Sequence, residues 1–206
     1  MRWAMDFLFA AIIGYLIGSV PFAYVIGKVF YRTDVRQHGS GNLGGSNTGR
    51  VLGGKAGLAV MTFDLLKVTL SVFLALILSH NIWVICCAAL AAACGHCYPI
   101  FVRFHGGKAV AALYGFLFAL WIFTDCTALV FFVPLITFLL ALAAFKIVSL
   151  SSIVSSFAAA LYVWLSHAHV AVIGSTVIFA VVIILRHHGN IRRMLSGTER
   201  KISWMK

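Results

Sequence analysis

Seven apolar runs separated by short polar segments constrain the fold of this chain more than any other feature of its sequence. The runs are Phe7–Phe30, Ala56–Ser79, Ile82–Phe101, Ala109–Phe123, Cys126–Phe145, Ile153–Leu165 and Val170–Leu185. The stretches Ala109–Phe145 and Ile153–Leu185 have 37 and 33 residues. As single helices each would be about 50 Å long, whereas the hydrocarbon core of a bilayer measures ~30 Å. We therefore expect each stretch to turn back, at Thr124-Asp125 and at Ser166–His169.

The scarcity of charge indicates that lipid surrounds most of the chain. Of its 206 residues, 62% are hydrophobic and 10% are charged, against roughly 25% charged residues in a soluble domain. The first run has 24 residues, longer than the ~7–15 residues of a signal-peptide core, so we expect it to remain as the first span. The sequence predicts an all-α polytopic integral membrane protein with about seven transmembrane helices, forming a single membrane-embedded domain over residues 1–206.

The basic residues are divided unevenly between the two sets of loops. If the loops alternate sides, one side collects 13 of the 16 Lys and Arg residues, while the other has Arg2 alone. The 13 are Arg32, Arg36, Arg50, Lys55, Arg103, Lys108, Lys146, Arg186, Arg192, Arg193, Arg200, Lys201 and Lys206. Because basic loops stay in the cytoplasm, the N-terminus is predicted outside and the C-terminus in the cytoplasm. Membrane anchoring thus accounts for the net charge of +11, and no nucleic-acid partner is expected.

Two glycine-rich segments on the predicted cytoplasmic side have the composition of an anion-binding site. In GSGNLGGSNTGR, residues 39–50, glycines allow positive φ angles that turn backbone N–H groups toward one concavity. Short polar side chains and a planar guanidinium accompany them: Ser40, Asn42, Ser46, Asn47 and Arg50. A second turn, Gly106-Gly107-Lys108, opens the fourth apolar run, where a helix N-terminus and an ammonium can face the same anion. The alternative is that the glycines only form tight turns and the cations only anchor the loops.

Other motifs in the sequence lack the context that their chemistry requires. Gly39–Gly44 matches the dinucleotide-binding pattern but follows an apolar helix instead of a strand. Gly49–Lys55 resembles a P-loop, yet Ala56 occupies the position of the Mg²⁺-binding Ser or Thr. Cys94–Cys97 is similar to a thiol oxidoreductase motif, but the compartment predicted for it keeps thiols reduced. Neither paired-carboxylate catalysis, with only five acidic residues in the chain, nor a metal site is expected.

Four segments, in order along the chain, resemble the motifs of one enzyme family. They are residues 39–50, GHCYPIFVRFHGGKAVAA (95–112), VSLSSI (148–153) and RHHGNIRRMLSGTERKI (186–202). Together with Asp64 and Lys67, which are similar to a D-x-x-K pair, they resemble the acyl-phosphate:glycerol-3-phosphate acyltransferase family (PlsY). The chain departs from the family pattern at Gly45-Ser46, Ala109, Ala112 and Gly189. Ala109, which stands in place of a glycine, is expected still to suit a helix start.

The resemblance implies a reaction, its substrates and a cellular location. It implies transfer of a fatty acyl group from acyl phosphate to the 1-hydroxyl of glycerol 3-phosphate, giving lysophosphatidic acid and phosphate in the first step of phospholipid synthesis. Neither a cofactor nor a metal is implied. The implied location is the bacterial cytoplasmic (inner) membrane, with the site facing the cytoplasm. A further candidate partner is the soluble enzyme that makes acyl phosphate.

The resemblance also implies roles for individual residues. The candidate catalytic residues are Ser40, Arg50, Lys108 and His96. Arg50 would hold a substrate phosphate, and Lys108 would balance charge on the acyl phosphate or on the departing phosphate. The candidate substrate-binding residues are Gly41, Asn42, Ser46, Asn47, Gly106, Gly107, Ser149, Ser152, His187 and Asn190.

Several residues keep more than one interpretation at this point. His96 orients a phosphate, accepts a proton or is a buried structural residue. His187 and Asn190 either orient glycerol phosphate or cap the last span. Asp64 and Lys67 lie at i,i+3 in an apolar run and are expected to pair with each other as structural residues. The rival class of protein is an anion transporter, but the gathering of cations on one side of the membrane favours an enzyme.

Overall fold

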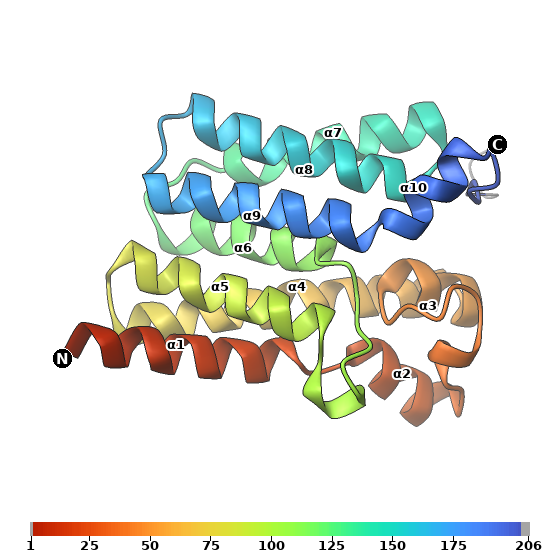
Figure 1. Ribbon diagram of the computed structural model, residues 1–206, viewed down its shortest axis with the longest axis horizontal. Helices are drawn as coiled ribbons and strands as arrows, with labels where there is room; N and C mark the ends of the chain where they lie inside the picture. The colour runs from red at the N-terminus through yellow and green to blue at the C-terminus, as the bar shows by residue number, and fades with distance from the viewer. Residues whose placement is uncertain (1, 203–206) are drawn as a thin grey trace. The chain divides into compact units, whose positions relative to one another are not determined.

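The computed structural model describes residues 2–202, and its regular structure is helical throughout (Figure 1). The α-helices are α1 (Arg2–Gly18), α2 (Phe22–Tyr31), α3 (Gly45–Leu52), α4 (Gly54–Leu78), α5 (Ile82–Cys97), α6 (Val110–Phe123), α7 (Leu129–Phe145), α8 (Val148–Leu165), α9 (Val170–Arg186) and α10 (His188–Leu195). Two short 3-10 turns, η1 (Val35–Gln37) and η2 (Ile100–Val102), lie between them. No strand occurs in residues 2–202, so the predicted all-α class is confirmed.

The two turns predicted from the lengths of the apolar stretches are confirmed. Helix α6 ends at Phe123 and α7 begins at Leu129, so the chain leaves its helix at Thr124-Asp125. Helix α8 ends at Leu165 and α9 begins at Val170. Every predicted apolar run therefore corresponds to helix in the structure.

Within the described residues, four helices are long and apolar enough to cross a membrane. They are Trp3–Tyr31, which takes α1 and α2 together, Gly54–Leu78, Ile82–Val102 and Val148–Leu165. A fifth is obtained if α9 and α10, which are bent by 58° relative to each other, count as one span. Helices α6 and α7 are apolar but shorter. The count of seven spans and the orientation of the termini stay predictions.

The first apolar run, which was expected to be the first span and counts as one candidate span, consists of two helices. Helix α1 ends at Gly18 and α2 begins at Phe22, with Pro21 between them at φ −92° and ψ 78°. Proline has no N–H, and its ring clashes with the carbonyl four residues earlier, so it cannot continue α1. The N–H groups of Tyr24 and Val25 donate to the Pro21 carbonyl, at 2.9 and 3.0 Å, and start α2.

The chain divides into two compact units, Met1–Ala119 and Leu120–Lys206. In the first unit, α1 packs along α4 and α5. Gly14 of α1 lies directly on the backbone of Ala88 in α5, where a side chain would overlap the carbonyl group. Small residues of this kind let apolar helices approach closely inside a membrane. In the second unit, α8 packs against both α7 and α9.

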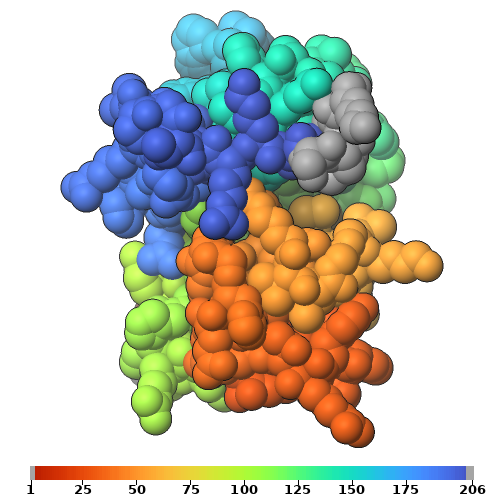
Figure 2. Space-filling model, turned by 90° about the vertical axis from the view of Figure 1, so that its right-hand side faces the viewer, coloured from red at the N-terminus to blue at the C-terminus, as the bar shows by residue number. Residues whose placement is uncertain are grey.

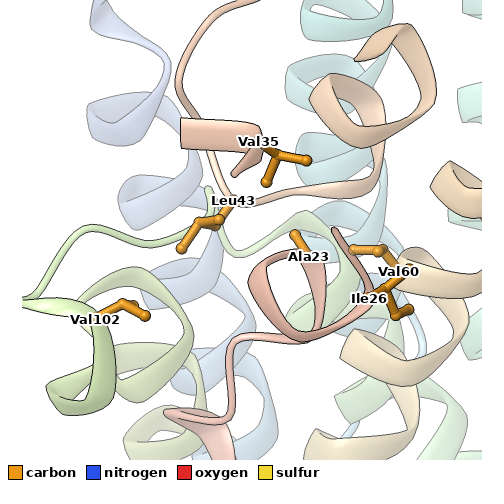
Figure 3. Packing of buried hydrophobic residues seen from close by; sticks show 6 residues of the cluster. All are labelled: Ala23, Ile26, Val35, Leu43, Val60 and Val102. Atoms are coloured by element: carbon orange, nitrogen blue, oxygen red, sulfur yellow. The ribbon is translucent and has the colours of Figure 1, made fainter. Parts of the chain in front are cut away.

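A cluster of buried hydrophobic residues fastens the first glycine-rich segment to the helices of the first unit (Figure 3). Its members are Ala23, Ile26, Val35, Leu43, Val60 and Val102. Val35 of η1 and Leu43 of the following loop are 0% and 4% exposed, and such burial stabilises by roughly 1.5–3 kcal/mol per side chain. The segment, orange in Figure 2, is therefore a packed part of the first unit that presents its outer side at the surface.

Candidate active site

The first glycine-rich loop is wrapped around the side chain of Asn47. The Oδ1 atom of Asn47 accepts from the backbone N–H of Ser40 at 2.8 Å. Its Nδ2 donates to the carbonyls of Val35 and His38, at 3.0 and 3.2 Å. Asn47 is 2% exposed, and these bonds engage its oxygen and both amide hydrogens. The buried Asn47 side chain thus fixes the conformation of the loop backbone.

Gly39 and Gly41, on either side of Ser40, have φ angles of 65° and 70°. The prediction that glycines give this loop positive φ angles is therefore confirmed at these two positions. A Cβ atom at Gly39 would also overlap Oδ1 of Asn47. Position 39 therefore requires glycine both for its backbone conformation and for lack of space. Ser40, between the two glycines, is exposed.

Helix α3 carries Ser46 and Arg50 on one exposed face. The two residues are one turn apart at i,i+4, so their side chains project in the same direction. A neighbouring side of α3 lies close to α4, because Gly57 of α4 touches the backbone of Gly45 and Gly49. The backbone under Arg50 is therefore held by direct helix-to-helix contact.

Arg36, in the segment between α2 and α3, is engaged in a local ion pair. Its Nε and one terminal nitrogen donate to the Asp34 carboxylate at 3.0 and 2.7 Å. Its guanidinium also lies 4.6 Å from the centre of the Tyr24 ring. The hydrogen bonds from Arg36 hold the pKa of Asp34 below its ordinary value. We therefore assign Arg36 to the support of η1.

A hydrogen bond joins the first glycine-rich loop to the second. The Nδ2 of Asn42 donates to the carbonyl of Gly106 at 3.0 Å, across 64 positions in the sequence. The loop bearing Ser40 and the turn bearing Lys108 therefore lie side by side in the first unit. Separation in sequence conceals this contact, although both segments were predicted to bind anions.

The second turn rests on the end of α5. The N–H of Gly107 donates to the carbonyl of His96 at 2.9 Å. A Cβ atom at Gly107 would overlap the His96 imidazole, and one at Gly106 would overlap the His96 and Cys97 carbonyls. These glycines are required by close packing, whereas Gly39 is required by conformation as well. Lys108 follows immediately and is half-buried.

Ala109 does not have the conformation expected at the start of a helix, which corrects the sequence-based expectation. Its φ angle is 61°, in the left-handed region, and its side chain is fully buried. A non-glycine residue there costs about 1–2 kcal/mol through crowding of its Cβ. Its carbonyl still accepts from the N–H of Leu113 at 2.8 Å and begins the hydrogen bonding of α6. The glycine of the family pattern suits this position better than alanine does.

The predicted pairing of Asp64 with Lys67 is confirmed. Nζ of Lys67 lies 2.6 Å from Oδ1 of Asp64, and the two side chains are 4% and 2% exposed. The same Nζ donates to the carbonyl of Val20 at 2.9 Å, next to the break between α1 and α2. Nδ1 of His96 lies 3.5 Å from Oδ1 of Asp64. His96 is thereby part of a buried polar group beneath the second glycine-rich turn.

In the second unit, Glu199 gathers two of the predicted residues. Its Oε1 accepts from Oγ of Ser149 at 2.7 Å and from Nδ2 of Asn190 at 2.6 Å. Its Oε2 accepts from Nε of Arg193 at 2.7 Å. Burial alone would raise the pKa of Glu199, but the hydrogen bonds from Asn190, Ser149 and Arg193 outweigh it and lower that pKa.

Sequence reasoning assigned no role to Glu199. The available signal was a single acidic residue within a basic C-terminal segment, in a chain with only five carboxylates. The other two predicted residues of the second unit bond to carbonyls four positions earlier, in α8 and α9. Oγ of Ser152 donates to the Val148 carbonyl at 2.8 Å, and Nδ1 of His187 lies 2.8 Å from the Ile183 carbonyl.

The predicted site residues therefore form two groups, one in each unit. The group of the first unit comprises Ser40, Gly41, Asn42, Ser46, Asn47, Arg50, His96, Gly106, Gly107 and Lys108. Hydrogen bonds between Asn42 and Gly106 and between Gly107 and His96 join its parts. These features define a helical protein of apolar helices whose glycine-rich loops carry cations suited to binding a phosphate.

Comparison with known proteins identifies the family. The model of the family described as glycerol-3-phosphate acyltransferase matches residues 8–197. A glycerol-3-phosphate acyltransferase of Geobacillus kaustophilus is 40% identical over 193 residues, covering 94% of each chain. Glycerol-3-phosphate acyltransferase 2 of Bacillus anthracis is 44% identical over 191 residues, covering 93% of this chain and 96% of the relative. The chain belongs to the glycerol-3-phosphate acyltransferase family, the family of PlsY.

A solved structure gives the same result for the fold. The crystal structure of PlsY, an integral membrane glycerol 3-phosphate acyltransferase, in its glycerol 3-phosphate form matches with a TM-score of 0.88 and 34% identity, covering 96% of each chain. Its lysophosphatidic acid form matches with a TM-score of 0.86 and 33% identity, covering 96% of this chain and 95% of that one. The fold is that of an integral membrane protein, and its relatives are bacterial.

Proposed function

We propose that the chain transfers a fatty acyl group from acyl phosphate to the 1-hydroxyl of glycerol 3-phosphate, giving lysophosphatidic acid and inorganic phosphate. Family membership supports the acceptor and the type of reaction. The glycerol 3-phosphate and lysophosphatidic acid forms of PlsY correspond to the acceptor and the product. The observation that carries the proposal is the bond from Asn42 to Gly106, which joins the segments bearing Arg50 and Lys108. Two joined cationic segments suit a reaction in which both substrates carry phosphate.

The proposed step balances without a cofactor or a metal. The 1-hydroxyl oxygen of glycerol 3-phosphate attacks the acyl carbonyl carbon, and a new ester bond forms. The bond between that carbon and the bridging phosphate oxygen breaks, and the hydroxyl proton passes to an oxygen of the departing phosphate. Acyl phosphate is a mixed anhydride with a stable leaving group, so fixed cations that stabilise developing charge matter more than a strong acid.

The residues of the first unit divide between contact with substrate and support. Arg50 holds two oxygens of a substrate phosphate with its planar fork, and Lys108 stabilises charge on the departing phosphate. Ser40 and Ser46, both exposed, donate to phosphate oxygens. Gly41 lets the backbone come close to the anion, and Gly106 and Gly107 bring the turn that offers its backbone to the anion against His96. Asn42 and Asn47 keep the two loops in shape.

The second unit is proposed to serve the same reaction. Glu199 sets the positions of Ser149 and Asn190. Ser152 lies on the same helix as Ser149, and His187 lies directly before α10, which carries Asn190. In this proposal Asn190 and His187 orient glycerol 3-phosphate, and the two serines line the substrate site. The family match extends over residues 8–197 and includes both units, which supports a single acyltransferase domain.

The proposed topology has seven spans, the N-terminus outside, and both the C-terminus and the active site in the cytoplasm. The soluble enzyme that makes acyl phosphate would then deliver the donor from that side. Positions 38 and 125 are exposed and test the topology. In a cysteine-free background, His38→Cys should resist an impermeant thiol reagent added to intact cells, whereas Asp125→Cys should react. The reverse labelling pattern would overturn the orientation.

Donor choice provides the main test of the proposed function. Purified protein in detergent would be given glycerol 3-phosphate with either palmitoyl phosphate or palmitoyl-CoA. The proposal predicts lysophosphatidic acid and phosphate in equal amounts from palmitoyl phosphate and no product from palmitoyl-CoA. Turnover of palmitoyl-CoA at a comparable rate would overturn it, because the donor would then be wrong.

A further inference from the structure

The buried group of Asp64, Lys67 and His96 is not used by the proposed chemistry. Asp64 and Lys67 both project from α4 and are 2% and 5% exposed. Placing a charge in the middle of a membrane costs roughly 2.5–3.5 kcal/mol on insertion scales, so an ion pair without a function is an expensive feature in an apolar helix. The contacts made by this group indicate a function for it.

His96 connects the ion pair to the second glycine-rich turn. Its Nδ1 faces Oδ1 of Asp64 at 3.5 Å, and its side chain is only 4% exposed. The other side of the ring faces Gly107, where a Cβ atom would overlap Nε2. Because a carboxylate accepts hydrogen bonds, we assign the ring proton to Nδ1, so that Asp64 sets both the tautomer and the orientation of the ring. The backbone of His96 also holds the turn, by accepting from the N–H of Gly107.

The chain of contacts continues to the first loop. Gly106, next to Gly107, accepts from Asn42 of that loop at 3.0 Å. An uninterrupted series therefore runs from α4 through α5 to both glycine-rich segments. On the other side of the group, Lys67 bonds to the Val20 carbonyl, which lies where Pro21 interrupts the helix and the N–H of Tyr24 donates to Pro21. Lys67 thereby satisfies a carbonyl that a continuous helix would have satisfied.

We propose that Asp64 is a positioning residue for the acyltransferase reaction. It fixes the His96 ring against Gly107 and so sets the place of Lys108, while Lys67 neutralises its charge inside the membrane and secures the break at Val20. His96 then supports the turn from beneath and does not touch the substrate. The kinetic consequences rest on the proposed function, whereas the structural consequences do not.

Two double variants separate positioning from charge neutralisation. Replacing a buried ion pair by apolar residues of similar volume is often tolerated, whereas removing one partner is strongly destabilising. D64L/K67M is uncharged and has no oxygen that can accept from His96. D64N/K67M is also uncharged but keeps an amide oxygen at the place of Oδ1. If the pair only balances charge, both variants should behave like the wild type.

Thr69→Val provides the matched control on the same helix. Oγ1 of Thr69 donates to the carbonyl of Gly115 at 3.0 Å and is buried. Its removal disturbs the contact of α4 with α6 and leaves the contacts of Asp64 and His96 in place. If Thr69→Val and the double variants lose stability alike, that loss is general. An effect found only in D64L/K67M then reports lost positioning.

Hydrogen exchange and kinetics should be measured on the same preparations. The proposal predicts faster exchange of the Gly107 amide in D64L/K67M than in the wild type or Thr69→Val. It also predicts a kcat about 10–100-fold lower in D64L/K67M, since small displacements of catalytic groups have effects of this size. D64N/K67M should recover most of both properties, and the KM values should change less than kcat.

Wild-type exchange and wild-type kcat in D64L/K67M would overturn the proposal, because the ion pair would then serve charge balance alone. Equal losses in Thr69→Val would overturn it as well, since general destabilisation would explain them. If the wild-type protein itself does not turn over palmitoyl phosphate, the proposed function is wrong. The exchange of the Gly107 amide still decides whether Asp64 positions the turn.

Discussion

In the first unit neutral amides hold the first glycine-rich loop of the candidate site, whereas in the second unit one carboxylate holds two of the predicted site residues. Asn47 bonds to three backbone groups of its loop, and Asn42 joins that loop to Gly106. In the second unit Glu199 accepts from Ser149, Asn190 and Arg193 at once. The loop that precedes Arg50 is thus held by uncharged side chains, whereas the turn that bears Lys108 rests on His96 and, through it, on the buried pair of Asp64 and Lys67.

This difference has consequences for how each region responds to change. An amide side chain has no proton to gain, so acid leaves the hydrogen bonds made by Asn42 and Asn47 unchanged. A carboxylate accepts several hydrogen bonds at once, so a single substitution or a single proton disturbs all of them. We therefore expect the first unit to govern turnover and the second unit to govern sensitivity to acid.

The largest expected effect is that of Lys108→Ala on turnover. If Lys108 stabilises charge that develops on the departing phosphate, kcat should fall by roughly 10²-fold or more, as for the removal of other groups of this kind. Arg50→Lys should mainly raise the KM for one substrate, since an ammonium cannot hold two phosphate oxygens as a guanidinium fork does. Steady-state kinetics with both substrates varied would check both expectations.

Lys55→Ala is the control for these two variants. Lys55 is an exposed cation that lies five residues after Arg50, and we assign it only an anchoring role. Its loss should leave kcat and KM within about twofold of the wild type, as for a surface charge of no direct function. Equal and mild losses in all three variants would mean that the cations are only anchors and that the site lies elsewhere.

The next largest effect is expected at Glu199. Glu199→Gln replaces a charged acceptor of three hydrogen bonds by a neutral amide, and hydrogen bonds to charged groups contribute about 1.5–3 kcal/mol. The melting temperature in detergent should fall, and kcat should fall with it because Ser149 and Asn190 lose their common partner. Arg192→Gln, at an exposed neighbouring cation, should leave both quantities unchanged. An unaltered melting temperature in Glu199→Gln would show that the second unit does not depend on this carboxylate and so does not differ from the first unit in this respect.

Acid should lower the stability of the second unit through protonation of Glu199. Because the folded pKa of Glu199 lies below its ordinary value of 4.5, its contribution to stability is present above that value. The contribution is lost as the pH falls through the lowered pKa. The melting temperature of the wild type should therefore fall more steeply between about pH 5 and 3 than that of Glu199→Gln. Asp34, whose pKa is also lowered, contributes equally to both proteins and cancels in this comparison.

The smallest effect concerns the backbone at the second glycine-rich turn. Ala109 and Ala112 are both fully buried, but only Ala109 has a positive φ angle. Changing either to glycine removes the same methyl group, but Ala112→Gly also loses about 1 kcal/mol of helix propensity within α6. Ala109→Gly should be more stable than Ala112→Gly by about 1–2 kcal/mol beyond that propensity difference, measured by thermal unfolding. A difference no larger than the propensity term would show that Ala109 is unstrained.

Much of the fold could be predicted because chain length and bilayer thickness determine it. The turns at Thr124-Asp125 and Ser166–His169 follow from apolar stretches too long for one span, and the pairing of Asp64 with Lys67 follows from helical spacing. The break at Pro21 was missed because the apolar run continues across it. Apolar composition does not report the helix-breaking effect of a single proline.

The residues of the site could be predicted from the sequence more readily than the contacts between them. Glycine content predicted the positive φ angles of Gly39 and Gly41, since few other residues adopt them. The contacts of Asp64 with His96 and of Ser149 with Glu199 join residues on different elements, 32 and 50 positions apart. No local pattern encodes such contacts, because they depend on how helices pack. For the same reason the strain at Ala109 became visible only in the structure.

The fate of the bridging oxygen tests the central claim of acyl transfer most directly. Palmitoyl phosphate labelled with ¹⁸O between its carbonyl carbon and phosphorus would be incubated with glycerol 3-phosphate and the wild-type protein, and the products analysed by mass spectrometry. Attack at the acyl carbon predicts one lysophosphatidic acid for each phosphate released, with all of the label in that phosphate. Label retained in free palmitate, or phosphate released without lysophosphatidic acid, would contradict the proposed reaction.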